Sequence, residues 1–347
     1  MKKPIVLFAI FFGLSSFVTA QTNFSLPQGE AVLVYSLPKT ELRIDIEIER
    51  TTQTPGEFFR SSNLLAARDV ITAERTTFRL KSVRVTPRAV VDLSRTFTLV
   101  PDRRNPINLS VNAQGLLCGI NVLCRETNVC CAKPTEQAST ASASPKLLPL
   151  IEEYMRATST VRMAEGAAKQ IFRIRESRIA LLTGDLDQLP ADGKSLKIML
   201  ERLDEMEREL TELFIGTTTT TTQTHTIFLT PSETMRNHVL FRVSSVSGLV
   251  PANDLSGAPY YISVVPTPIA TQQARNRQAA TATNTGLHSI LPAATQVTIG
   301  DGQNIFFAEQ FLMPQFGVTI PISEELLRRN DVKIYIDEQT GRLLRVE

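Results

Sequence analysis

Residues 161–216 read VRMAEGAAKQIFRIRESRIALLTGDLDQLPADGKSLKIMLERLDEMERELTELFIG, and this stretch organises the sequence around it. In its second half, apolar residues recur in alternating steps of three and four: Leu196, Met199, Leu203, Met206, Leu210 and Leu213. Residues at these steps share one face of an α-helix, so the spacing predicts a helix over Leu196–Phe214. The first half repeats the spacing with smaller residues and predicts another helix over Val161–Leu182.

The segment between the two predicted helices has the residues of a turn. Gly184 can adopt the left-handed conformation that closes a helix, and Pro190 disfavours helical geometry at the residue before it. Asp192 is suited to cap the start of the next helix, and Gly216 to end it. Because a short connection brings consecutive helices side by side, we expect an antiparallel helical hairpin.

The same turn has an acidic pattern that resembles a calcium-binding loop. Asp185, Asp187 and Asp192 are its candidate metal ligands. An EF-hand loop requires ligands at alternate positions, however, and here the third acid comes late and Lys194 intrudes. Helix capping and turn hydrogen bonds therefore account for these residues better than a metal ion.

One position on the apolar face of the first helix is occupied by a cation, Arg178. A buried cation is costly unless it is paired. Either Arg178 reaches solvent or an acidic residue of the facing helix, or it fixes the register of the pair or contacts a partner. We therefore include it among the candidate binding residues.

The N-terminus has the pattern of a secretory signal peptide over residues 1–20. Lys2 and Lys3 precede a mostly apolar run over 5–18, and small residues lead up to Ala20. The run is too short for an ordinary membrane-spanning helix, and no second candidate follows. We expect an exported protein that does not span the membrane. Lys and Arg number 37 against 35 Asp and Glu, so charge does not indicate a nucleic-acid partner.

The four cysteines cluster within a short stretch: Cys118, Cys124, Cys130 and Cys131. In an exported protein such a cluster favours disulfides over free thiols. Because a bond between adjacent cysteines is strained, we expect Cys130 and Cys131 to pair with Cys118 and Cys124. A zinc site is the alternative, but the spacing lacks paired CxxC motifs and no histidine is near.

The remaining sequence is mostly strand-like. Residues 41–50 alternate apolar and charged side chains without error, as in a half-buried strand, and the acids among them are best explained as its solvated face. Threonines occupy every position of 217–222, which favours an extended ribbon. Further strands are expected at 31–35, 77–86, 96–100, 107–111, 239–244, 260–265, 296–299, 317–322, 332–336 and 342–346, and a short helix at 58–67.

These elements predict an α+β fold with two mainly antiparallel β domains flanking the long helical hairpin. Residues 21–131 form the N-terminal β domain with the cysteine cluster. A polar linker over 132–146 follows, then the hairpin over 147–216 and a C-terminal β domain over 217–347.

No motif identifies a reaction. The chain lacks HExxH, GxSxG, a phosphate-binding loop and a dinucleotide fingerprint, and its three histidines have no acidic or cysteine partner nearby in sequence. We predict no catalytic residue and no cofactor. A hydrolase with paired carboxylates stays an alternative, although the sequence selects no pair. Tyr260 and Tyr261, beside an exposed loop, are the candidate residues for binding a glycan or a peptide.

Four stretches together resemble a known family. They are YSLPKTELRIDIEIERTTQTPGEF at 35–58, the hairpin sequence at 174–216, LFRVSSVSGLVPANDLSGAPYYI at 240–262 and PQFGVTIPI at 314–322. They are similar to the exported Bacteroidetes proteins known as domain of unknown function 4831, and the LLTGDxDxxPxDG turn is the most specific part. The resemblance implies a Gram-negative envelope location, in the periplasm or at the outer membrane, and no assigned activity.

The sequence thus favours a non-enzymatic envelope protein that acts in interaction or assembly, with an envelope protein as partner. The alternative is a glycan- or peptide-binding module of the periplasm or cell surface.

Overall fold

The computed structural model describes residues 32–100, 107–124, 159–184, 193–267, 285–329 and 331–347. These residues form three antiparallel sheets and a pair of helices, and the protein is mostly β. The predicted signal peptide, the linker at 132–146, Cys130, Cys131 and the acids of the helical turn lie outside the described residues.

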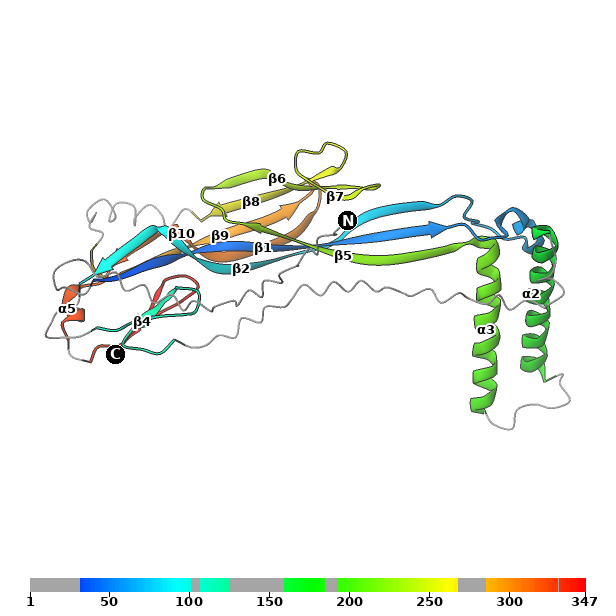
Figure 1. Ribbon diagram of the computed structural model, residues 1–347, viewed down its shortest axis with the longest axis horizontal. Helices are drawn as coiled ribbons and strands as arrows, with labels where there is room; N and C mark the ends of the chain where they lie inside the picture. The colour runs from blue at the N-terminus through cyan, green and yellow to red at the C-terminus, as the bar shows by residue number, and fades with distance from the viewer. Residues whose placement is uncertain (1–31, 101–106, 125–158, 185–192, 268–284, 330) are drawn as a thin grey trace, which may run out of the picture.

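A long three-stranded ribbon forms the axis of the molecule (Figure 1). Its central strand β1 (Leu33–Thr54) pairs with β2 (Arg75–Leu99) on one side and β5 (Thr217–Leu229) on the other. As predicted over 41–50, β1 alternates: Leu42, Ile44, Ile46 and Ile48 are fully buried, while the residues between them reach the polar face.

A five-stranded sheet packs against the buried face of this ribbon. In spatial order its strands are β10 (Ile305–Pro321), β9 (His288–Gly300), β8 (Ala258–Pro266), β6 (Met235–Ser244) and β7 (Gly248–Val250). Phe241, Ile262, Val297 and Met313 meet the isoleucines of β1 in one hydrophobic core. Strands that precede and follow the helices in sequence therefore share this core.

A four-stranded sheet completes the end of the molecule away from the helices. Its order is β12 (Leu343–Val346), β11 (Ile334–Ile336), β4 (Leu117–Ile120) and β3 (Leu109–Val111). A second core joins this sheet to the beginning of β1, through Tyr35 and Leu37, and to the short helix α5 (Glu324–Leu327). The predicted hairpin at 332–346 is confirmed, because β11 pairs with β12.

The helices lie at the opposite end of the ribbon, roughly across it (Figure 1). They are α2 (Thr160–Thr183) and α3 (Gly193–Ile215), and the 3₁₀ helix η1 (Phe59–Leu65) connects β1 to β2 beside them. Gly184 and Gly216 end the two helices with φ of 81° and 89°, as the turn chemistry predicts.

The tip of the ribbon holds the end of α3. The last carbonyls of a helix have no partner within the helix. Here the backbone N–H of Phe58 donates to the Leu213 carbonyl at 2.7 Å, and that of Ile71 donates to the Ile215 carbonyl at 2.9 Å. A Cβ on Gly56 would lie 2.2 Å from the Leu213 oxygen, so this close approach requires glycine.

The predicted fold class, two β domains flanking a long helical hairpin, is wrong. Strands from both sides of the helices hydrogen bond in shared sheets: β1 with β5, and β4 with β11. The helices do not hold two sheets apart but lie at one end of a continuous ribbon. Periodicity within each segment could not reveal these pairings, because they join residues far apart in sequence.

Several strands are also longer than predicted. The expected strands at 31–35 and 41–50 are joined, since residues 33–35 and 41–50 belong to the single strand β1, which continues through Pro38 at a break in register. Proline is tolerated at such irregularities although it cannot donate to the sheet. Likewise 77–86 and 96–99 are both parts of β2.

Candidate interaction site

The seam between α2 and α3 is closed by small residues on one helix and large ones on the other. Ala164, Ala167 and Ile171 of α2 are fully buried, as are Leu210 and Phe214 of α3. The alanines allow the helices to approach closely at the end nearest the ribbon. There the ring of Phe214 packs against that of Phe58, with centroids 5.6 Å apart.

Ion pairs close one side of the seam further along and show that the helices are antiparallel. Arg175 contacts Glu207 at 2.6 Å, and Arg178 contacts Asp204 at 2.8 Å and Glu207 at 3.2 Å. The hydrogen bond to Asp204, together with the charge of Glu207, raises the pKa of Arg178. The interpretation that Arg178 pairs with acids of the facing helix is confirmed.

The other side of the seam is open. A groove of about 580 Å³ lies between the helices, lined by Glu176, Ser177, Ala180 and Leu181 of α2 and by Met199, Arg202 and Leu203 of α3. Consecutive helical residues turn by about 100°, which places this groove on the side of the seam away from the ion pairs. Its floor is mainly apolar, and charged side chains occur only at its rim.

Apolar side chains extend from the seam onto the surface of the pair. Ile179 and Leu182 of α2 and Ile198 and Met199 of α3 are exposed, with Ile198 at 65% and Met199 at 45%. Sequence periodicity identified Met199 and Leu203 as seam residues but not as groove residues. Ser177, Ala180 and Arg202 were missed, because they lie outside the apolar spacing that the sequence shows.

Tyr260 and Tyr261 lie in β8 with their side chains on opposite faces, as consecutive strand residues do. Tyr260 stacks on Phe241 with centroids 5.0 Å apart and contacts Phe306 with its ring tilted. Burial, and secondarily the charge of Asp301, raises the pKa of Tyr260. No single groove can be lined by both rings, and a role in ligand binding stays a prediction.

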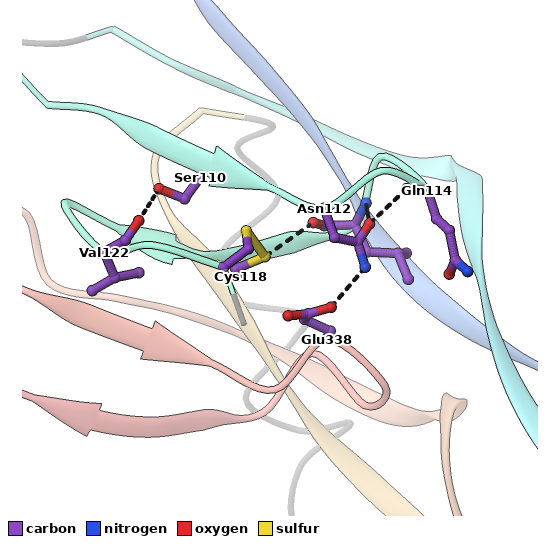
Figure 2. The surroundings of a disulfide bond; sticks show 8 residues. Ser110, Asn112, Gln114, Cys118, Val122 and Glu338 are labelled. Atoms are coloured by element: carbon purple, nitrogen blue, oxygen red, sulfur yellow. Dashed lines mark hydrogen bonds between the residues drawn. A yellow bond between two sulfur atoms is a disulfide. The ribbon is translucent and has the colours of Figure 1, made fainter. Parts of the chain in front are cut away.

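A disulfide joins Cys118 in β4 to Cys124 (Figure 2). The expected pairing of these residues with Cys130 and Cys131 is therefore wrong. Beside the bond, the Asn112 amide donates to Glu338 at 2.7 Å, which links the β3–β4 turn to the β11–β12 turn. The Asn112 side-chain oxygen accepts the backbone N–H groups of Gln114 and Leu116.

Possible metal ligands come together only at this disulfide within the part of the chain that the structure describes. They are the two sulfurs and Glu338. Sulfurs bonded to each other cannot act as thiolates. The candidate calcium ligands Asp185, Asp187 and Asp192 lie outside the described residues.

The acids of β1 are paired with arginines of β1 itself or of the neighbouring β2. Glu41 contacts Arg88 at 3.0 Å, Glu49 contacts Arg79 at 2.7 Å, and Asp45 contacts Arg43 at 3.1 Å. This confirms the interpretation of these carboxylates as a strand's solvated face.

A buried polar cluster joins β1 to β9 and was not predicted. Tyr35 Oη donates to the Gly286 carbonyl at 2.9 Å and accepts the backbone N–H of His288 at 2.7 Å. The imidazole of His288 stacks on Phe97, with centroids 4.1 Å apart. Burial lowers the pKa of His288, and a hydrogen bond to Gly286 opposes the shift. The sequence carried no signal for this contact, since Tyr35 and His288 are 253 positions apart.

Among the helices of the described residues, none is long and apolar enough to cross a membrane. Comparison with curated proteins and with solved structures finds no match. The family comparison is positive over almost the whole chain: residues 31–344 match the family described as Domain of unknown function (DUF4831). The chain therefore belongs to this family.

Proposed function

We propose that this protein is a non-enzymatic component of the cell envelope that binds another envelope protein through the groove between α2 and α3. The groove is the observation that carries this proposal. Its apolar floor and the exposed side chains around it offer surface that a partner's apolar residues would cover.

The position of the groove supports this role. The ribbon places the helical pair at one end of the molecule, away from the four-stranded sheet (Figure 1). β5 alone is 13 residues long, about 40 Å at the usual rise of a strand. A partner at the helices would therefore be accessible without contact with the four-stranded sheet.

An envelope location is part of the proposal. The N-terminal pattern of Lys2, Lys3 and an apolar run supports export. The bond between Cys118 and Cys124 is of the kind that persists in oxidising compartments. Cell fractionation with mass spectrometry of the N-terminus tests this part: a chain that begins after Ala20 in the envelope fraction is expected. An intact N-terminus in the cytosol would contradict it.

Site-specific photo-crosslinking in cells tests the binding site. A crosslinking amino acid at Met199 in the groove should give an adduct with another protein. The same amino acid at Glu201, on the other face of α3, is the matched control and should give none. Ala180→Glu, which places a charge in the open groove, should abolish the Met199 adduct while leaving the fold intact. Adducts made only with the protein's own chain, or formed equally from Glu201, would refute the proposal.

A further inference from the structure

The three sheets of the described residues have six edge strands, and five of these carry a feature that hinders pairing with another chain. β3 and β7 have 3 residues each, and β12 has 4. β10 breaks register twice and contains Pro314. The edge of β2 carries charges at Arg79, Lys81, Arg84 and Arg88. Short length, irregularity and charge are the usual protections of a sheet edge.

β5 has none of these protections. Its 13 residues, TTTTTTQTHTIFL, include no Asp, Glu, Lys, Arg, Pro or Gly. It pairs with β1 along its whole length without a shift in register. Residues 217–226 are all exposed. Within the described ranges, β1 is the only strand paired with β5, so about six N–H and six C=O groups face outward along its other edge.

The surroundings of this edge define what could pair with it. Figure 1 shows α3 leaving the end of the ribbon on the side where β5 lies, so the edge and the helix form a corner. A second copy paired antiparallel through β5 would direct its own α3 into the body of the first molecule.

β5 itself carries no charged side chain, and two cations of the neighbouring β2 are paired with acids of β1, which favours an uncharged segment. Arg79 contacts Glu49 at 2.7 Å and Lys81 contacts Glu47 at 3.9 Å. Lys81 also donates to the hydroxyl of Thr222 at 3.3 Å. With no charged side chain of its own, β5 offers no ion pair to an acidic or basic peptide, whereas its row of threonines suits β-branched neighbours across a strand pair.

We propose that the free edge of β5 binds an extended, uncharged segment of another protein, which adds to the ribbon as a fourth strand. Main-chain hydrogen bonds supply the affinity of such strand addition, and alternate side chains supply its specificity. This inference goes beyond the proposed function, because the edge is a surface separate from the groove.

Amide hydrogen exchange measured by NMR on the full chain tests it. The probe is a capped nine-residue peptide of alternating threonine and valine. The peptide should slow exchange at every second amide of β5 and leave the amides between them unchanged, since those already bond to β1. Thr220→Lys should weaken peptide binding at least about tenfold, because a charged side chain hinders pairing at an edge. Thr76→Lys, on the charged edge of the same ribbon, is the matched control and should have no effect.

Three results would overturn the inference. The peptide could leave exchange in β5 unchanged. The outward-facing β5 amides, which do not bond to β1, could already be slow in the free monomer, which would mean that the protein's own chain covers the edge. Sedimentation could show a dimer with that same protection, which would make a second copy the occupant. The groove variant Ala180→Glu should bind the peptide normally, so failure of this inference and failure of the proposed function are distinguishable.

Discussion

Replacing Phe214 with alanine should release the helical pair from the ribbon while leaving the β cores intact. Phe214 is fully buried, and its cluster of Phe58, α2 and α3 residues shares no member with the cores around β1 and β9. A phenylalanine side chain buries about 200 Å², worth about 5 kcal/mol at 25 cal/mol per Å². Measured Phe→Ala losses in cores are about 3–5 kcal/mol, so we expect about 4 kcal/mol.

Hydrogen exchange with mass spectrometry on native protein measures this loss locally. Peptides from α2 and α3 should exchange faster by the factor that corresponds to about 4 kcal/mol, close to a thousandfold. Peptides from β9 should be unchanged. Phe172→Ala is the matched control, because Phe172 also lies in the helical pair, on α2, but is 45% exposed. It should cost less than about 1 kcal/mol.

Two outcomes would refute this reasoning. If β9 exchanged faster to the same extent as α2 and α3, the helices and the sheets would unfold as one unit. If Phe214→Ala cost no more than Phe172→Ala, the ring would not hold the pair to the ribbon.

Three further predictions concern other parts of the fold. Gly56→Ala should destabilise the protein by more than about 2 kcal/mol in urea unfolding, because its Cβ would meet the Leu213 carbonyl at 2.2 Å. Burial lowers the folded-state pKa of His288. The contribution of this neutral imidazole to stability should therefore be full above about pH 6.5 and fall, by up to about 1.4 kcal/mol per pH unit, as the pH drops towards the lower folded-state pKa. His288→Phe should flatten this part of a stability–pH curve. Cys118→Ser should cost about 2 kcal/mol in thermal unfolding, since the bond closes a loop with a sequence separation of 6, and a reducing agent should then have no further effect on the variant.

The sequence determines the local structure well where one face of an element is buried. The steps of three and four in 161–216 predicted α2 and α3 to within three residues at each end, and Gly184 and Gly216 marked their ends. The alternation in 41–50 predicted which side chains of β1 enter the core. In each case the nearest neighbours in sequence carry the pattern, so no knowledge of distant contacts is required.

The arrangement of these elements could not be read in the same way. Nothing in the threonines of β5 specifies β1 as their partner, because they present the same side chain in every register. The groove depends on how far α2 and α3 separate, which periodicity does not encode. Arg178 was predictable in part. Its charge at an apolar position of the helix indicated an acidic residue of the facing helix as one possible partner, but the sequence did not single out Asp204 and Glu207.

The length of the ribbon also fixes the distance between the helical pair and the β cores. Ile48 lies in one row with Leu80 of β2 and Gln223 of β5, and the rows continue to the tip. Two residues inserted in one strand alone would be absorbed as a bulge. The ribbon can lengthen only if all three of its strands gain residues at matching rows. The distance from the β cores to the helical pair is therefore set jointly by β1, β2 and β5.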